Sequence, residues 1–254
     1  MQDLDRVADV VRGIAGAQGC AVVALSGGVD SAVVAAAAKA ALGQGAEPVT
    51  VASELTPRRE LMAAHAVAGY LGLTLRVAPL RVLELDEVRA NGPQRCYWCK
   101  RAVFGALGAV GPGPRPVAVL DGTTADDDPQ RPGRRAAAEL GVHSPLAAAG
   151  LDKADVRALA AALGLPNAAH APESCLATRF IEGDPLVEEA LRRVEALEDG
   201  LLALGLWGVR ARPEAETLQV ALPPGQDPEP HADAVAALAR RAGFTAVRYT
   251  VRVP

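Results

Sequence analysis

The stretch that decides the fold is Ala21-Val22-Val23-Ala24-Leu25-Ser26-Gly27-Gly28-Val29-Asp30-Ser31. Its first five residues are apolar, which predicts a strand that is buried on both faces at the centre of a parallel sheet. An alanine-rich helical pattern follows Ser31. In a fold of this kind a ligand binds at the carboxyl end of the central strand, where the glycine loop begins.

The loop between strand and helix has the chemistry of an anion cradle. Gly27 and Gly28 let the backbone approach a ligand closely, and the start of the helix presents unpaired N–H groups and the positive end of the helix dipole. Ser26 and Ser31 add hydroxyl groups. The loop lacks the Gly-Lys-Ser/Thr ending of a Walker A loop, so transfer of a γ-phosphate is not the indicated chemistry.

The rest of the first 165 residues alternates short β-rich runs with longer helical ones, which predicts an α/β fold with a parallel sheet and helices on both faces. Strands are expected near 20–25, 47–53, 73–78 and 116–121, and helices near 4–17, 31–42, 57–71, 97–108 and 152–164.

After Phe180 the pattern changes to that of a small α+β domain. Residues 184–204 show apolar side chains at three- and four-residue steps, which predicts one amphipathic helix. Strands are expected near 207–212, 216–222 and 245–253, and a helix near 231–242. We therefore predict two domains, one over 1–182 and a smaller one over 183–254.

Composition limits the partners and the compartment. The 254 residues include 26 Lys and Arg against 30 Asp and Glu, and a net charge of −4 argues against bulk capture of nucleic acid. The chain has no apolar stretch of membrane-spanning length, and its first residues lack the pattern of a signal peptide. We expect a cytoplasmic protein with a small-molecule substrate and no membrane partner.

Three of the four cysteines are arranged for chemistry. Cys96 and Cys99 are three positions apart at the start of a predicted helix, and Cys175 follows much later. A reducing cytoplasm favours metal binding or catalysis over a disulfide. Three uses remain open: a [4Fe-4S] cluster with one free iron, a three-cysteine metal site with a labile ligand such as His170, or a single nucleophile without a metal.

Residues 26–31 as a whole resemble the PP-loop of the ATP pyrophosphatases. The resemblance implies that ATP is attacked at its α-phosphate, that a substrate oxygen is adenylated and that pyrophosphate leaves with the help of Mg²⁺. It implies ATP contacts from Ser26, Gly27, Gly28, Val29, Asp30 and Ser31.

Further segments together resemble the LarE family, the ATP-dependent sulfur transferases of nickel-pincer cofactor synthesis. The segments are Cys96-Tyr97-Trp98-Cys99-Lys100, Asp121-Gly122-Thr123-Thr124-Ala125-Asp126-Asp127, Arg131-Pro132-Gly133, Ser144-Pro145-Leu146 and Cys175-Leu176-Ala177-Thr178-Arg179. The family implies that a carboxylate of pyridinium-3,5-biscarboxylic acid mononucleotide is adenylated and that sulfur then displaces AMP, which leaves a thiocarboxylate. It also implies a homo-oligomer, with a PP-loop ATP pyrophosphatase domain over 1–182 and a substrate-binding or oligomerisation domain over 183–254.

The resemblance implies a role for each matching residue. Cys175 and Asp30 would be catalytic; Asp121, Thr123, Asp126 and Arg179 would complete the ATP site; Trp98, Arg210 and Arg212 would bind substrate. Arg210 and Arg212 alternate along a predicted strand, so both point to one face, as a substrate phosphate requires. In one branch of the family Cys175 would give up its own sulfur. In the other, which the three cysteines favour, Cys96, Cys99 and Cys175 would hold a [4Fe-4S] cluster that carries a sulfide.

Some residues depart from the family pattern, and other functions stay open. Thr124 stands where asparagine is usual, Ile181-Glu182 replaces a usual Pro-Tyr, and Gln219 replaces a glutamate. The alternatives are a tRNA thiolase or an ammonia-dependent synthetase with the same loop, and a non-enzymatic adenine-nucleotide-binding module. The acidic net charge disfavours the thiolase, and the arrangement of the cysteines disfavours the synthetase. The non-enzymatic module would not explain Asp30 together with Cys175.

Overall fold

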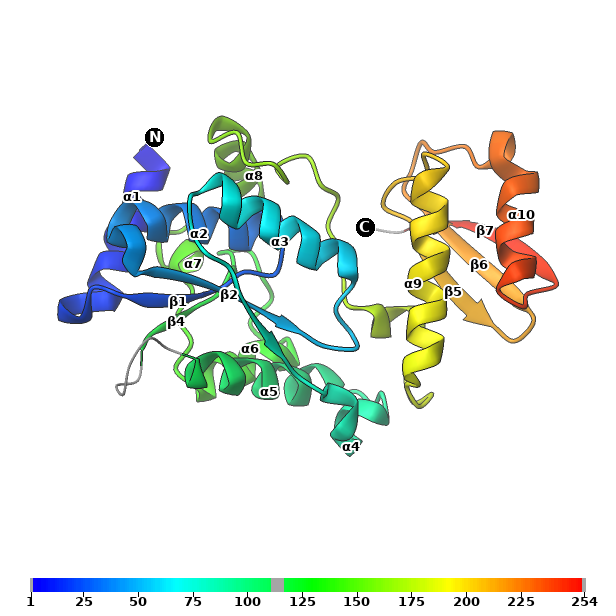
Figure 1. The fold of residues 1–254 in the computed structure, drawn as a ribbon, viewed down its shortest axis with the longest axis horizontal. Coiled ribbons are helices and arrows are strands. Elements are labelled where there is room, and N and C mark those ends of the chain that lie inside the picture. Colours follow the sequence, from blue (N-terminus) through cyan, green and yellow to red (C-terminus); the bar gives the residue numbers. More distant parts are fainter. Residues whose placement is uncertain (1, 111–116, 253–254) are drawn as a thin grey trace. The chain divides into compact units, whose positions relative to one another are not determined.

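The apolar strand β1 (Ala21–Ala24) lies inside a four-stranded parallel sheet, as its sequence predicts (Figure 1). The other strands are β2 (Ala46–Ala52), β3 (Arg76–Pro79) and β4 (Val119–Leu120), in the order β3-β2-β1-β4. The computed structural model describes residues 2–110 and 117–252, so residues 116 and 253 of two expected strands lie outside the described residues. Within the described part, the α/β fold with a parallel sheet is confirmed.

Helices cover both faces of this sheet (Figure 1). Those of this part are α1 (Gln2–Ala15), α2 (Val29–Leu42), α3 (Arg58–Tyr70), α5 (Arg95–Ala109), α6 (Pro132–Glu139), α7 (Pro145–Ala148) and α8 (Lys153–Ala162). Val22 packs with side chains of α5 and α6, whereas Val23 packs with α1, α2 and α8 on the other face. This alternation places both faces of β1 in apolar surroundings and explains why the strand has no polar side.

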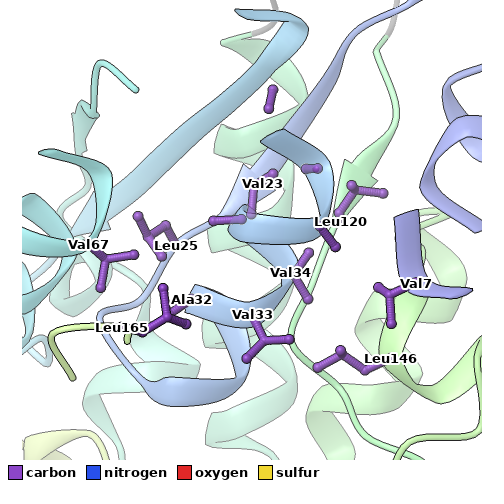
Figure 2. Close-up of a cluster of buried hydrophobic side chains, with 14 of the residues drawn as sticks. Val7, Val23, Leu25, Ala32, Val33, Val34, Val67, Leu120, Leu146 and Leu165 are labelled. Atoms are coloured by element: carbon purple, nitrogen blue, oxygen red, sulfur yellow. The ribbon is translucent and has the colours of Figure 1, made fainter. Parts of the chain in front are cut away.

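The larger core surrounds α2 (Figure 2). Val33 and Val34 of α2 lie among Val23 of β1, Leu120 of β4 and Leu146 of α7, and all five are fully buried. Because neighbours surround α2, its sequence is apolar nearly all round. The core thereby fixes the position at which the glycine loop enters the helix.

A second compact unit contains a three-stranded sheet with helices on one face. In this unit β5 (Arg210–Glu214) pairs antiparallel with β6 (Thr217–Leu222), which pairs parallel with β7 (Ala246–Val251). The helices α9 (Glu188–Ala203) and α10 (Ala232–Arg241) pack on the sheet through apolar residues such as Leu197 and Val235. A mixed sheet in a small α+β unit agrees with the expected fold class.

The division between the units follows contacts rather than a single cut in the sequence. Residues 1–82 and 94–170 form the first unit, and residues 83–93 with 171–254 form the second. The short helix α4 (Asp86–Arg89) therefore belongs to the second unit. Asn91 links residues 83–93 to the rest of the second unit through two hydrogen bonds. Its Nδ2 donates to the Ile181 carbonyl at 2.8 Å, and its carbonyl accepts from Gly183 N at 2.9 Å. The predicted boundary at 182 falls inside this second unit.

Several elements differ from the sequence-based expectation. The helix expected over 184–204 begins at Glu188, because Val187 is extended at its N-cap. The short helices α4, α6 and α7 were not expected, and α6 and α7 each begin with proline in the first turn, a position that proline favours. Short 3₁₀ turns occupy Gly16–Gln18, Gly43–Gly45, Val82–Glu84, Leu176–Arg179 and Glu229–His231. Across residues 2–110 and 117–252, no helix has the length and apolar character needed to cross a membrane.

Candidate active site

The glycine loop forms a closed turn at the carboxyl end of β1. Gly27 has φ +92°, and a Cβ at this position would lie 2.2 Å from the Glu60 carbonyl oxygen, so only glycine fits. The Ser31 hydroxyl donates to the Gly28 carbonyl at 2.9 Å and accepts from Ser26 N at 3.2 Å. The Ser26 hydroxyl accepts from Gly28 N at 3.3 Å. The loop is thereby held in shape by its own side chains, at the N-terminus of α2 where an anion is favoured.

Two other segments approach this loop closely. Asn167 is buried, and its Nδ2 donates to the Gly27 carbonyl at 2.7 Å. Gly122 lies against the start of α2, since a Cβ there would be 2.8 Å from Ser31 N. The loop that follows β4 is therefore in contact with the phosphate loop. Sequence reasoning missed Asn167, which no motif marks.

The predicted ATP residues Asp121 and Thr123 lie in that neighbouring loop. Asp121 accepts from Thr123 N at 3.1 Å and from the Thr123 hydroxyl at 2.8 Å, which closes a tight turn. Asp126 is exposed and accepts from Lys153 N at 3.2 Å. The first unit thus brings together residues 26–31, Asp121 and Thr123 at the carboxyl edge of the sheet.

Two carboxyl groups near the loop have shifted pKa values in opposite directions. Burial raises the pKa of Asp30, and the negative charge of Asp127 adds to this while Lys153 opposes it. For Asp127, burial disfavours the charged form, but hydrogen bonds from Lys153 and Thr124 outweigh it and lower its pKa to about 2. The Lys153 Nζ lies 2.9 Å from Asp127 Oδ1. Asp127 is therefore held as a paired carboxylate, while Asp30 is a less well-solvated one.

Cys96 and Cys99 lie one turn apart on α5, with Cys96 exposed and Cys99 half-buried. Trp98 is half-buried, and its ring meets that of Tyr97 edge to face at 5.0 Å. Tyr97 is fixed by a 2.7 Å hydrogen bond to Glu139 of α6. None of the four cysteines, all of which lie within the described residues, forms a disulfide. Over the described ranges no group of three His, Cys, Asp or Glu side chains was found that could hold a metal ion.

Cys175 belongs to the second unit and begins a short 3₁₀ turn, η4 (Leu176–Arg179). Its carbonyl accepts from Thr178 N at 3.1 Å and from the Thr178 hydroxyl at 2.9 Å. Leu176 and Ala177 are fully buried and anchor the turn, whereas Cys175 itself is half-buried. The thiol is thus carried on a fixed backbone.

Arg179, an expected ATP ligand, has no exposed side-chain surface. Its Nε and Nη2 donate to the two carboxylate oxygens of Glu198 at 2.7 and 2.9 Å. Its Nη1 donates to the Ser174 carbonyl at 2.9 Å. In this arrangement the guanidinium organises the Cys175 turn and presents no donor to a nucleotide.

Arg210 and Arg212 lie on one face of β5, because Ala211 between them is buried against the helices. Burial lowers the pKa of Arg210, and the positive charges of Arg252, Arg179 and Arg212 lower it further. The Nε of Arg212 is buried and has no hydrogen-bond partner. Guanidinium groups gathered in this way favour a bound anion. Sequence reasoning missed Arg252, which belongs to the same charged group.

The sequence of this chain matches one family model and is similar to several known proteins. The family model described as NAD synthase matches residues 4–86, which include the phosphate loop. The chain is 34% identical over 203 residues to the pyridinium-3,5-bisthiocarboxylic acid mononucleotide synthase of Lactiplantibacillus plantarum, covering 79% of this chain and 74% of that one. It is 36% identical over 207 residues to an uncharacterized protein of Synechocystis, covering 81% and 77%. An uncharacterized protein of Methanocaldococcus jannaschii is 34% identical over 134 residues, 52% of each chain.

Proposed function

The chain belongs to the family of pyridinium-3,5-bisthiocarboxylic acid mononucleotide synthases, the LarE family, and we propose that it converts a carboxylate of a pyridinium mononucleotide to a thiocarboxylate. It is an ATP-using, sulfur-transferring enzyme. One observation carries the proposal. The similarity to the synthase extends over 203 residues, so it is not limited to the nucleotide-binding segment 4–86.

In the proposed reaction ATP first activates the substrate. A carboxylate oxygen of pyridinium-3,5-biscarboxylic acid mononucleotide attacks the α-phosphorus, the bond to the bridging oxygen breaks, and pyrophosphate leaves. The N–H groups at the start of α2 and the hydroxyls of Ser26 and Ser31 hold the phosphates. Asp30 would hold Mg²⁺ there, since this ion typically takes one or two carboxylates together with substrate phosphates, and the ion would offset the negative charge of the departing pyrophosphate.

Sulfur then attacks the acyl carbon, and AMP leaves with the electrons of the C–O bond. Cys96 and Cys99 lie one helical turn apart on α5, and together with Cys175 they would make a three-thiolate donor set of the kind that iron–sulfur clusters use. A [4Fe-4S] cluster held by these three residues would supply a bound sulfide, because three thiolates leave one iron without a protein ligand. In the other version of the proposal Cys175 is the nucleophile, and its own C–S bond must break to release the product.

We expect Asp30→Asn to abolish pyrophosphate release while leaving the chain folded.

The same substitution should change the stability of the chain, because the pKa of Asp30 is higher in the folded chain than in the unfolded one. Asp30 therefore favours folding when it is protonated at low pH, and this contribution is lost as the pH rises through the folded pKa. The substitution should therefore raise the melting temperature at pH 7, and this gain should shrink toward pH 4, near the ordinary pKa of an aspartate.

Pyrophosphate release tests both the proposal and the role of Asp30. With the wild-type chain and ATP, release should depend on added pyridinium-3,5-biscarboxylic acid mononucleotide. Release at the wild-type rate from Asp30→Asn would remove this residue from the mechanism. Release that does not respond to the mononucleotide would contradict the proposed substrate.

Arg210→Ala and Arg212→Ala are each expected to weaken binding of the mononucleotide by about 10-fold or more, because each removes charged hydrogen bonds to its phosphate. ATP binding should change little, and Arg240→Ala, at an exposed residue of α10, is the matched control. Isothermal titration calorimetry with each ligand separates these effects. Equal losses for both ligands would mean that the arginines serve the fold instead.

A further inference from the structure

Glu198 is a fully buried carboxylate that contacts two parts of the second unit at once. Its Oε1 accepts from Arg179 Nε at 2.7 Å, and its Oε2 accepts from Arg179 Nη2 at 2.9 Å. Neither side chain is exposed to solvent. A bidentate pair between a planar guanidinium and a carboxylate has one favoured geometry. A displacement of one group is therefore transmitted to the other.

The same carboxylate also holds the strand that carries the arginines. Glu198 Oε1 accepts from Ala211 N at 3.0 Å. Ala211 lies between Arg210 and Arg212, and β5 is an edge strand, so this N–H has no partner strand on that side. The Glu198 carboxylate therefore accepts the hydrogen bond that a neighbouring strand would otherwise accept. It does so between the two residues that carry the anion-binding guanidinium groups.

Arg179 carries the connection on to the thiol-bearing turn. Its Nη1 donates to the Ser174 carbonyl at 2.9 Å, to the Ser174 hydroxyl at 2.6 Å and to the Cys175 carbonyl at 3.3 Å. It also donates to the Thr178 hydroxyl at 2.9 Å. A continuous set of hydrogen bonds thus joins Ala211 N to the backbone at Cys175, buried around Glu198 and part-buried at the turn.

We propose that Glu198 is a positioning residue that couples the binding of an anion by Arg210 and Arg212 to the placement of Cys175. The anion is a phosphate monoester, the group that the mononucleotide substrate carries. The inference therefore rests on the proposed function, and it adds a coupling between two parts of that site. An anion that draws the two arginines together shifts the edge of β5. Glu198 and Arg179 then transmit the shift to the turn, because a buried ion pair does not exchange its partners for water.

The test is the alkylation of Cys175 by iodoacetamide in the iron-free chain, followed by mass spectrometry of the peptide that contains it, with and without inorganic phosphate. In the wild-type chain phosphate should change this rate by about fivefold or more, the usual lower range of coupling between two sites. In Glu198→Gln, which keeps the shape and loses the charge, phosphate should leave the rate unchanged. Phosphate affinity, measured by calorimetry, should stay within about threefold of wild type, because Glu198 does not itself carry the anion.

Glu195→Gln is the matched control, since Glu195 is a buried acid on the same helix that pairs with Arg192. It should respond to phosphate as the wild type does. If circular dichroism shows that Glu198→Gln is unfolded, Arg179→Lys takes its place, because lysine keeps the charge without the two-point geometry, and the response should again be lost. A wild-type rate that ignores phosphate, or a full response in a folded Glu198→Gln or Arg179→Lys chain, overturns the inference. A wild-type chain that responds to phosphate but transfers no sulfur would contradict the proposed function alone.

Discussion

Cys175→Ala is expected to abolish thiocarboxylate formation completely while pyrophosphate release continues, because adenylation precedes the step that needs sulfur. In the version of the proposal in which the three cysteines hold a [4Fe-4S] cluster, Cys96→Ala and Cys99→Ala should abolish sulfur transfer as well. Anaerobic wild-type protein should then be brown and hold about four irons per chain, and each substitution should remove the colour and the activity together. Assays of iron and acid-labile sulfide measure the cluster content of each variant, and the visible spectrum measures its colour.

Cys20→Ala is the control for this series, because Cys20 lies outside the motif and should leave iron content and turnover unchanged. A colourless protein that loses the mass of one H₂S at Cys175 after a single turnover would contradict the cluster. It would instead assign the sulfur to the cysteine side chain and preserve the sulfur-transferase function.

Arg179→Ala is expected to destabilise the second unit by about 3–5 kcal/mol, since it leaves the Glu198 carboxylate buried without its ion partner. Arg248→Ala removes an exposed pair with Glu214 in the same unit and should cost less than about 1 kcal/mol. Urea unfolding followed by the fluorescence of Trp207, which lies in this unit, compares the two variants. A loss for Arg179→Ala no larger than that for Arg248→Ala would show that the buried pair contributes little.

The centre of the fold was predictable because local sequence and tertiary environment agree there. The strand at 21–25 has no polar face, and the structure places β1 between two strands with helices on both sides. The glycine loop was predictable for the same reason, since only glycine fits at Gly27. The short helices α6 and α7 were missed, because eight and four residues give too little periodicity to stand out.

The environment of Arg179 was not predictable from its motif. The resemblance implies ATP binding, whereas the structure pairs the side chain with Glu198, 19 residues away on another element. A signal for this burial did exist. Glu198 follows Val194 by four positions and precedes Leu201 by three, so helical spacing places it on the apolar face of α9. The orphan Nε of Arg212 and the contact of Asn167 with Gly27 depend on tertiary packing that no local pattern reports.

In the proposed reaction this chain replaces a carboxylate oxygen by sulfur using ATP. Mass spectrometry of pyridinium-3,5-biscarboxylic acid mononucleotide, incubated anaerobically with the chain, ATP, Mg²⁺ and equal sulfide and ammonium, tests it most directly. We expect a product in which one sulfur has replaced one carboxylate oxygen, with one AMP and one pyrophosphate formed for each sulfur. An amide product, or an unchanged mononucleotide while ATP is consumed, would contradict it.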